Sequence, residues 1–181
     1  MIPEQIPEDD LPTEIDVWFQ EPSAKRALWS FFWLVFYRPS PRPFHAWRSM
    51  LLRLFGAQMG PRCHFYPDAR VSHPWNLVCA DAVTLGDKAE ILNPEPIKLE
   101  SHAIISQGAC VLRARSLGAY AWVCAHATVG PGVRIGDGAV LGLASVTSAD
   151  LEAWGVYAGN PARKVKERRR HALPIADILI P

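Results

Sequence analysis

Paired cysteines, a membrane-length apolar run and a basic leader are all missing from this sequence. Its four cysteines, Cys63, Cys79, Cys110 and Cys124, show no CxxC spacing, so we expect reduced packing residues and no zinc site. The apolar stretch from Ala27 to Tyr37 is far shorter than the roughly 20 residues that cross a bilayer. Residues 1–22 carry seven acidic side chains and no basic one, which argues against a secretory signal and favours a cytoplasmic protein.

An excess of charge of one sign is also lacking, since 19 Lys and Arg face 18 Asp and Glu. The charge is unevenly spread, with the acidic lead-in at one end and a basic cluster within 163–170 at the other. Such a cluster suits a phosphate-bearing ligand, an acidic lipid or nucleic acid, and a solvated tail is an equal alternative. We expect no nucleic-acid partner.

A six-residue period is the strongest pattern that is present. Every sixth residue is aliphatic in the series Leu99, Ile105, Val111, Leu117, Val123, Val129, Ile135 and Leu141. A helix needs a period of 3.6 and a strand needs 2, so a period of six indicates a solenoid. The sequence therefore predicts an all-β solenoid whose triangular coils each use three hexads.

Small or branched residues precede these aliphatics by two positions, which predicts a second inward-facing series, and only Arg115 breaks it. Gly118, Gly130, Gly136 and Gly142 follow their aliphatics directly, and such glycines suit a positive φ or a close backbone approach. A weaker series upstream adds one or two coils. It shifts register at 93–96, where two extra residues precede Leu99.

Two helices are predicted before the solenoid. Ser23 can cap a helix through Tyr37 that ends before Pro39, and a second helix runs from about Phe44 to Phe55. The second helix places four apolar residues on one face: Phe44, Trp47, Leu51 and Leu54. We thus divide the chain into a flexible acidic lead-in at 1–22, a helical segment at 23–56, the solenoid at 57–162 and a basic tail at 163–181.

The helical segment has two possible roles. It can cover the open end of the solenoid core, as repeat proteins require, and this interpretation is favoured. Alternatively it contacts a membrane surface through 27–37, inserting aromatic residues while arginines meet lipid phosphates. The aromatic residues in question are Trp29, Phe31, Phe32, Trp33 and Phe36, and the arginines are Arg38, Arg42, Arg48 and Arg53.

Six stretches resemble the hexapeptide-repeat acetyltransferases, in particular the colanic acid biosynthesis branch related to maltose, galactoside and nodulation-factor acetyltransferases. They occur in the family's order at 47–57, 74–77, 105–109, 121–123, 129–133 and 158–162. The resemblance implies a left-handed parallel β-helix. It also implies transfer of acetyl from acetyl-CoA to a sugar hydroxyl of a surface polysaccharide, at clefts between the subunits of a homotrimer.

The family's general base is a histidine in a loop that projects from one coil, where it takes the proton of the attacking hydroxyl. That loop is missing here, because Leu112 is followed by Arg113, Ala114 and Arg115 and then directly by Ser116 and Leu117. His126 and His102 are weak substitutes. They are separated by four hexads, whereas one coil uses three, which predicts different faces of one subunit. Nothing in the spacing of the other histidines, His45, His64, His73 and His171, suggests ligands.

Other site residues follow from the resemblance. Asn93 matches the family's active-site asparagine, which orients the acceptor. The alternative is a structural role, because asparagine also favours a turn before a proline such as Pro94. The resemblance places these residues along acetyl-CoA: Trp122, Ala125, Leu143, Gly159, Asn160, Pro161, Arg163 and Lys164. Arg163 and Lys164 would meet phosphates.

Three interpretations stay open. The first is a sugar O-acetyltransferase that works slowly or with a relocated base. The second is a catalytically impaired trimer that binds CoA or sugar, and the third is a scaffold at a membrane surface.

Overall fold

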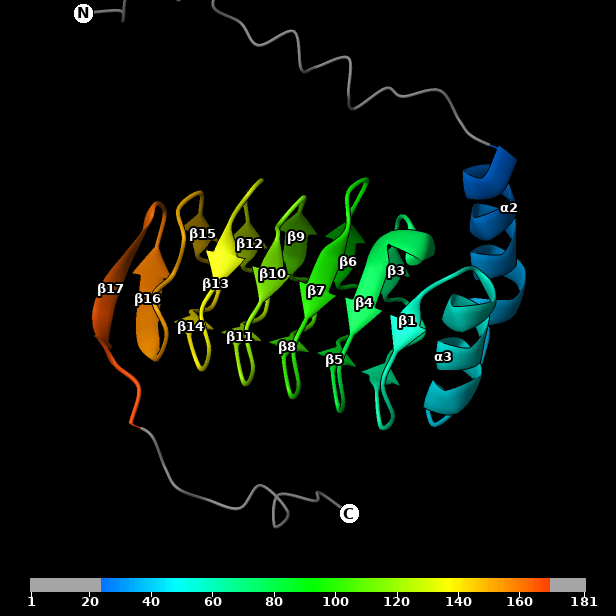
Figure 1. Cartoon of the computed structure of the whole chain (residues 1–181), viewed down its shortest axis with the longest axis horizontal. Helices are drawn as coiled ribbons and strands as arrows, with labels where there is room; N and C mark the ends of the chain where they lie inside the picture. Colours follow the sequence, from blue (N-terminus) through cyan, green and yellow to red (C-terminus); the bar gives the residue numbers. More distant parts are fainter. Residues whose placement is uncertain (1–23, 170–181) are drawn as a thin grey trace, which may run out of the picture.

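The computed structural model describes residues 24–169 and shows a parallel β-solenoid of five coils with helices at one end (Figure 1). Its strands form three sheets, which we call faces A, B and C. Face A contains β1 (Gln58–Met59), β4 (Leu77–Cys79), β7 (Ile97–Leu99), β10 (Ser116–Leu117) and β13 (Arg134–Ile135). Face B contains β2 (His64–Phe65), β5 (Thr84–Leu85), β8 (Ile104–Ile105), β11 (Trp122–Val123), β14 (Val140–Leu141), β16 (Gly155–Gly159) and β17 (Ala162–Glu167). Face C contains β3 (Arg70–Val71), β6 (Glu90–Leu92), β9 (Cys110–Leu112), β12 (Thr128–Val129) and β15 (Val146–Thr147).

The core is the pair of series that the period predicts. All eight aliphatics from Leu99 to Leu141 are buried, and alanines such as Ala103 and Ala121 fill the smaller inward positions. Neighbouring coils are joined by parallel pairing, for example Val123 with Ile105 and Leu141. The predicted solenoid and both of its inward series are therefore confirmed. The weaker upstream series contributes two complete coils.

Arg115 does not take the inward position that the hexad count gives it. Arg115 is exposed, and Ala114 is buried in its place. The backbone reaches the left-handed region at Arg113, with φ 48°, one residue earlier than the equivalent corner at His126 would suggest. The turn at Arg113 is one residue tighter, and the segment that leads into β10 is one residue longer. The charge of Arg115 therefore stays in solvent, and β10 keeps its register with the neighbouring strands.

The glycines that follow the aliphatics serve close backbone approach. A Cβ on Gly136 would lie 2.5 Å from the backbone nitrogen of Ala153, which no real packing allows. Positive φ occurs instead at other glycines, among them Gly108, Gly132 and Gly138. Of the two uses predicted for Gly136 and its equivalents, tight packing between coils is the one that applies.

Coil length changes along the solenoid, and the difference lies at the corner between faces C and A. Val78 pairs with Lys98, and Lys98 pairs in turn with Ser116, so the earlier of these two coils is the longer one. The first such corner holds the 3₁₀ turn η3 (Pro74–Asn76), and the second holds 93–96. The third corner, at 113–115, has no such extension.

The helical cap covers the first coil. It consists of α2 (Ala24–Phe32), the π-helical turn η2 (Trp33–Tyr37) and α3 (His45–Leu54). Trp29 and Phe55 are buried in contact at 5.0 Å between ring centroids, and Trp29 Nε1 donates to the Val71 carbonyl at 2.7 Å. These contacts pack the helices against the first coil, and the first helical segment ends before Pro39, as predicted. The N-cap prediction at Ser23 lies outside the described residues.

The buried face of α3 is not the predicted apolar one. Phe44, Trp47 and Leu54 are exposed at 52, 38 and 70%, and of the four predicted residues only Leu51 is buried. The helix instead packs through Arg48 and Leu52, because the Arg48 guanidinium fills an internal position and donates to the Phe65 and Pro41 carbonyls. Arg48 is therefore not available to a lipid phosphate.

At the other end, β17 runs antiparallel to β16 and closes the sheet of face B. The range 163–181 predicted as a basic tail thus begins inside a strand, and Arg168 donates to the carbonyls of Tyr120 and Gly138. The four cysteines are unpaired. Cys63 and Cys79 are buried, whereas Cys110 and Cys124 are half-buried beside the inward alanines.

Candidate functional site

The residues predicted to line acetyl-CoA gather along face B and its corner with face C. Trp122 is an outward residue of β11, and Ala125 lies at the corner that follows. Leu143 lies at the same corner of the next coil. The two corners are joined by a hydrogen bond from the Ala144 amide to the Ala125 carbonyl at 3.0 Å. Gly159 ends β16 beside this corner, where its amide donates to Ser145 Oγ at 3.0 Å. The structure brings these four residues into one band.

A groove of about 570 Å³ lies on face B next to this band. Trp122 Nε1 donates to Ser106 Oγ at 2.7 Å, which holds the indole next to a residue that lines the groove. His126 lines the groove, and its ring lies directly over Gly108, where a Cβ would be 2.6 Å from the imidazole. Tyr66 and the Ser106 hydroxyl also line the groove, and an aromatic side chain beside a hydroxyl suits a long, thin, amide-containing ligand.

The C-terminal hairpin supplies the predicted phosphate ligands. Asn160 and Pro161 form its tip, joined by a cis peptide bond, and Arg163 is exposed beside them. Lys164 is already paired, with Glu152 at 2.7 Å and Glu167 at 2.8 Å. These hydrogen bonds raise the pKa of the Lys164 ammonium group. Arg163 is thus better placed than Lys164 to meet a phosphate.

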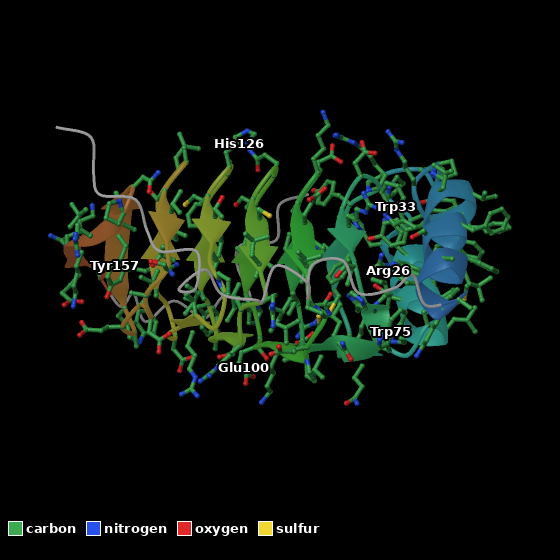
Figure 2. The ribbon with its side chains drawn as sticks, turned by 90° about the horizontal axis from the view of Figure 1, so that it is seen from above. Arg26, Trp33, Trp75, Glu100, His126 and Tyr157 are labelled. Atoms are coloured by element: carbon green, nitrogen blue, oxygen red, sulfur yellow. The ribbon has the colours of Figure 1, made fainter. Side chains whose placement is uncertain are left out.

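The two candidate histidines occupy different corners, as their spacing predicts. His102 lies between faces A and B, where its ring stacks on Tyr120 with 4.9 Å between centroids and 4° between planes. His126 lies between faces B and C, and Figure 2 shows it projecting from the side of the molecule opposite Trp75. No single chain brings the two histidines together.

Asn93 lies at the corner of faces C and A, away from the predicted cofactor band. It is 1% exposed, and its side chain is held by the preceding coil. The Oδ1 accepts from the His73 amide at 3.1 Å, and Nδ2 donates to the His73 carbonyl at 2.9 Å. The Asn93 amide also donates to Ser72 Oγ at 2.9 Å. In this arrangement Asn93 fixes the backbone of residues 72 and 73.

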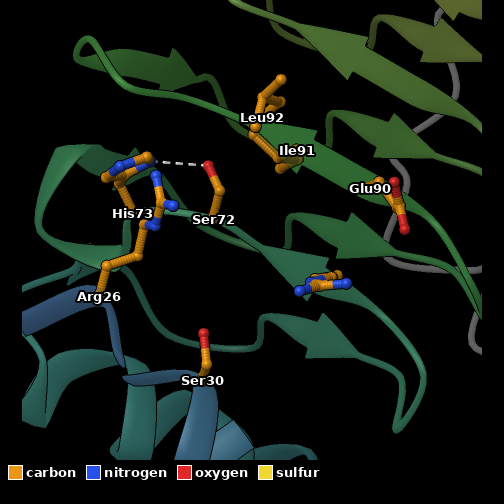
Figure 3. Close-up of a pocket in the computed structure, with 8 residues that line it drawn as sticks. Arg26, Ser30, Ser72, His73, Glu90, Ile91 and Leu92 are labelled. Carbon is orange, nitrogen blue, oxygen red and sulfur yellow. Dashed lines mark hydrogen bonds between the residues drawn. The ribbon is translucent and has the colours of Figure 1, made fainter. Parts of the chain in front are cut away.

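A cavity of about 390 Å³ opens beside these residues, between α2 and face C (Figure 3). Ser72 Oγ lies 2.8 Å from His73 Nδ1, and the His73 ring makes an edge contact with Trp75. Burial, and then the positive charge of Arg26, lower the pKa of His73. Hexad counting gave no sign of this cluster, because its partners come from the corners of two successive coils and from a helix outside the solenoid.

Comparison with known proteins decides the family. The chain is 32% identical over 144 residues to WcaF of Escherichia coli K12, which is named for an acetyltransferase role in colanic acid biosynthesis; the match covers 71% of this chain and 79% of WcaF. The chain belongs to the hexapeptide-repeat acetyltransferases. A shorter match, 29% identical over 99 residues, joins 51% of this chain to 49% of galactoside O-acetyltransferase of E. coli K12. No family model matches the sequence.

Solved structures agree on the fold. A hexapeptide-repeat acetyltransferase from Vibrio cholerae superposes with a TM-score of 0.72 at 19% identity, over 81% of this chain and 92% of the other. A galactoside acetyltransferase in complex with coenzyme A superposes equally well, with a TM-score of 0.72 at 18% identity over 88% and 85%. Membership identifies this protein as an acetyl-CoA-dependent acetyltransferase of the hexapeptide-repeat class.

The third corner of faces C and A is the place where the resemblance implies a histidine-bearing loop. The structure closes that corner with Arg113, Ala114 and Arg115 alone. The Arg113 amide donates to the Leu92 carbonyl at 2.8 Å, and its carbonyl accepts from the Gly132 amide at 2.9 Å. Backbone pairing across the third corner is therefore continuous.

Proposed function

We propose that this protein transfers acetyl from acetyl-CoA to a hydroxyl of a sugar used in surface polysaccharide assembly. The observation that carries the proposal is the band on face B, where Trp122 is hydrogen-bonded to Ser106, a residue that lines the groove, on the scaffold of an acetyltransferase family. Backbone amides along such a groove can hold pantetheine and the oxyanion of the thioester carbonyl. Arg163 at the open end offers a cation to the CoA phosphates.

The active unit in this proposal is a homotrimer in the cytoplasm. The cofactor band follows the edge of faces B and C, whereas Asn93 lies at the edge of faces C and A. The two edges of one chain do not converge, so the cleft is completed when a second copy sets its cofactor band against the Asn93 edge. Oligomeric state is measured by light scattering. A monomer that transfers acetyl would contradict this arrangement.

Calorimetric titration with acetyl-CoA, followed on the same sample by thiol release with a panel of sugars, tests the proposed reaction. We expect saturable binding and sugar-dependent release of CoA. Trp122→Ala should weaken acetyl-CoA binding by about 1–2 kcal/mol, because a half-exposed aromatic contact is lost. Val165→Ala, an exposed apolar position on β17, is the control. Binding without thiol release would instead identify a catalytically impaired trimer.

His126→Ala and His102→Ala examine the two histidines first suggested as bases. His126 lies over the groove, so its loss should alter acetyl-CoA affinity. His102 is stacked on Tyr120 at another corner and should change neither affinity nor rate. A rate loss of a hundredfold or more in either variant, with affinity kept, would make that histidine the base.

A second proposal concerns the outer face of the helical cap, which we infer contacts an anionic membrane surface. Nine large apolar residues are exposed there: Leu28, Phe31, Leu34, Val35, Phe36, Phe44, Trp47, Met50 and Leu54. Over the rest of the described chain only four are. Besides the internal Arg48, residues 24–56 contain five Lys and Arg and no acidic residue, a combination suited to acidic headgroups over an apolar layer. No helix in 24–169 is long and apolar enough to cross a membrane.

Co-sedimentation with vesicles tests the cap surface. The protein should pellet with vesicles that contain phosphatidylglycerol and much less with pure phosphatidylcholine. Phe31→Glu and Leu34→Glu, at residues 55 and 57% exposed, should abolish pelleting, and Val165→Glu at the opposite end should not. Equal pelleting of all variants contradicts the proposal. Loss of self-association in Phe31→Glu, without any vesicle binding by the parent protein, would assign the face to a second copy.

A further inference from the structure

Three residues form a column along the edge of faces C and A. Arg70 pairs with Glu90 and Glu90 with Cys110, which puts His73, Asn93 and Arg113 at equivalent places in three successive coils. Coils are spaced by about 4.8 Å. The corner that lacks the family's histidine loop is the third of the column. His73 therefore lies on that same edge, roughly 10 Å away along the axis.

The hydrogen bonds around Ser72 favour one tautomer of His73. Ser72 Oγ accepts from the Asn93 amide at 2.9 Å and donates to Asn93 Oδ1 at 3.2 Å. When Ser72 Oγ gives its single proton to Asn93 Oδ1, the 2.8 Å contact with His73 Nδ1 is made by a proton on Nδ1. With the proton on Nδ1, the unprotonated nitrogen of the neutral ring is Nε2.

We propose that His73 Nε2 is the general base of the acetyl transfer, in place of the absent loop histidine. The inference rests on the proposed function, and it adds an identified base, an acceptor pocket and a class of acceptor. Asn93 then acts as a positioning residue, because it fixes Ser72 and the backbone of His73 without touching the substrate.

The reaction balances with these groups alone. His73 Nε2 takes the proton of the sugar hydroxyl as its oxygen attacks the thioester carbon of acetyl-CoA. A new C–O bond forms and a tetrahedral oxyanion results. When the oxyanion collapses, the C–S bond breaks, and the imidazolium returns its proton to the leaving thiolate. The products are the acetylated sugar and CoA, and the base is regenerated.

Charges around the cavity indicate the acceptor. Arg26 of α2 and Arg70 of β3 line it, and Glu90 of β6 is the single acidic side chain among the lining residues. Lys25 of α2 lies over Trp75, with its Nζ 4.3 Å from the ring centroid. The balance is positive, so an acceptor with a carboxylate or phosphate beside the reacting hydroxyl fits better than a neutral sugar. Two arginines can hold such a group while the hydroxyl faces His73.

The same surroundings keep His73 ready as a base. Burial and Arg26 disfavour the imidazolium, so the pKa of His73 lies below its ordinary value of 6.5. The ring is neutral at pH 7, and it loses its function as a base only when the pH falls below that lowered pKa. The kcat/KM profile should therefore have an acidic limb that begins below pH 6.5 and that belongs to His73.

His73→Asn is the decisive variant, because an Asn amide can still donate to Ser72 Oγ while it offers no base. We expect acetyl-CoA affinity to be unchanged and kcat to fall by about 10²–10³-fold, with loss of the acidic limb. Added imidazole should restore part of the rate. His64→Asn, at an exposed position on face B, is the matched control and should keep the parental profile.

The outcomes separate this inference from the proposed function. If the parent protein neither binds acetyl-CoA nor releases thiol, the proposed function fails. If the parent transfers acetyl and folded His73→Asn, checked by its melting temperature, keeps the parental rate and acidic limb, His73 is not the base. Acceptors with and without an acidic group are compared in the same assay. Equal kcat/KM for both would remove the acidic-acceptor assignment.

Discussion

At the N-terminal end of the solenoid α2 and α3 bury Trp29, Leu52 and Phe55 against the first coil, whereas at the C-terminal end β17 leaves nearly all of its residues exposed. Both ends must cover a core that the next coil would otherwise cover. One end does so with large side chains, and the other does so with an antiparallel strand and its backbone hydrogen bonds. The stability of the two ends should therefore respond to different substitutions.

Trp29→Ala should have the largest effect. The indole is 2% exposed and also donates to the Val71 carbonyl, so we expect a loss of about 3–5 kcal/mol in the free energy of unfolding. Urea denaturation followed by circular dichroism measures it. Phe31→Ala on the outer face of the same helix should cost under about 0.5 kcal/mol. Equal losses would show that the helix does not cap the core.

Tyr37→Phe should stabilise the cap. The Tyr37 hydroxyl is buried and, among the described residues, has no hydrogen-bond partner, and burial raises its pKa. Removing an unpaired buried hydroxyl should add about 1 kcal/mol to the free energy of unfolding. A lower urea midpoint in this variant would mean that the hydroxyl has a partner in solution.

Tyr157→Phe makes the same change at the other end and should have the opposite sign. Tyr157 Oη accepts from the Glu152 amide at 2.9 Å. Its removal leaves a backbone donor without that partner, and we expect a loss of about 1 kcal/mol. Comparing the signs of the two Tyr→Phe changes by thermal unfolding sharpens the contrast between the ends.

Lys164→Ala should have the smallest effect. Lys164 pairs with Glu152 and Glu167 on an exposed strand, where salt and water screen the charges. Surface pairs of this kind contribute little to stability, so the melting temperature should hardly change. A large drop in melting temperature would show that the hairpin depends on its ion pairs.

The sequence predicted the solenoid because its core repeats, and a repeat can be read without knowing what it packs against. The inward side of α3 could not be read in this way. The apolar stripe of α3 faces outward. Arg48 faces inward, because its guanidinium donates there to the carbonyls of Phe65 and Pro41. The predicted inward position of Arg115 was wrong for a similar reason. A count of six residues does not show where a turn tightens.

The candidate site was predicted in part. Trp122, Ala125 and Leu143 fall in one band because their spacing follows the coil. The pocket at His73 depends on Asn93, which belongs to the following coil, and on α2, which precedes the whole solenoid. Contacts of that kind leave no periodic trace in the sequence. They depend on the three-dimensional positions of the first two corners between faces C and A.

The tight third corner also bears on how such enzymes diverge. Because its backbone pairs with both neighbouring coils at the amide and carbonyl of Arg113, a segment can leave or enter the chain there while every flanking strand keeps its partner. Gain or loss of a loop at this corner would leave the core of the solenoid unchanged.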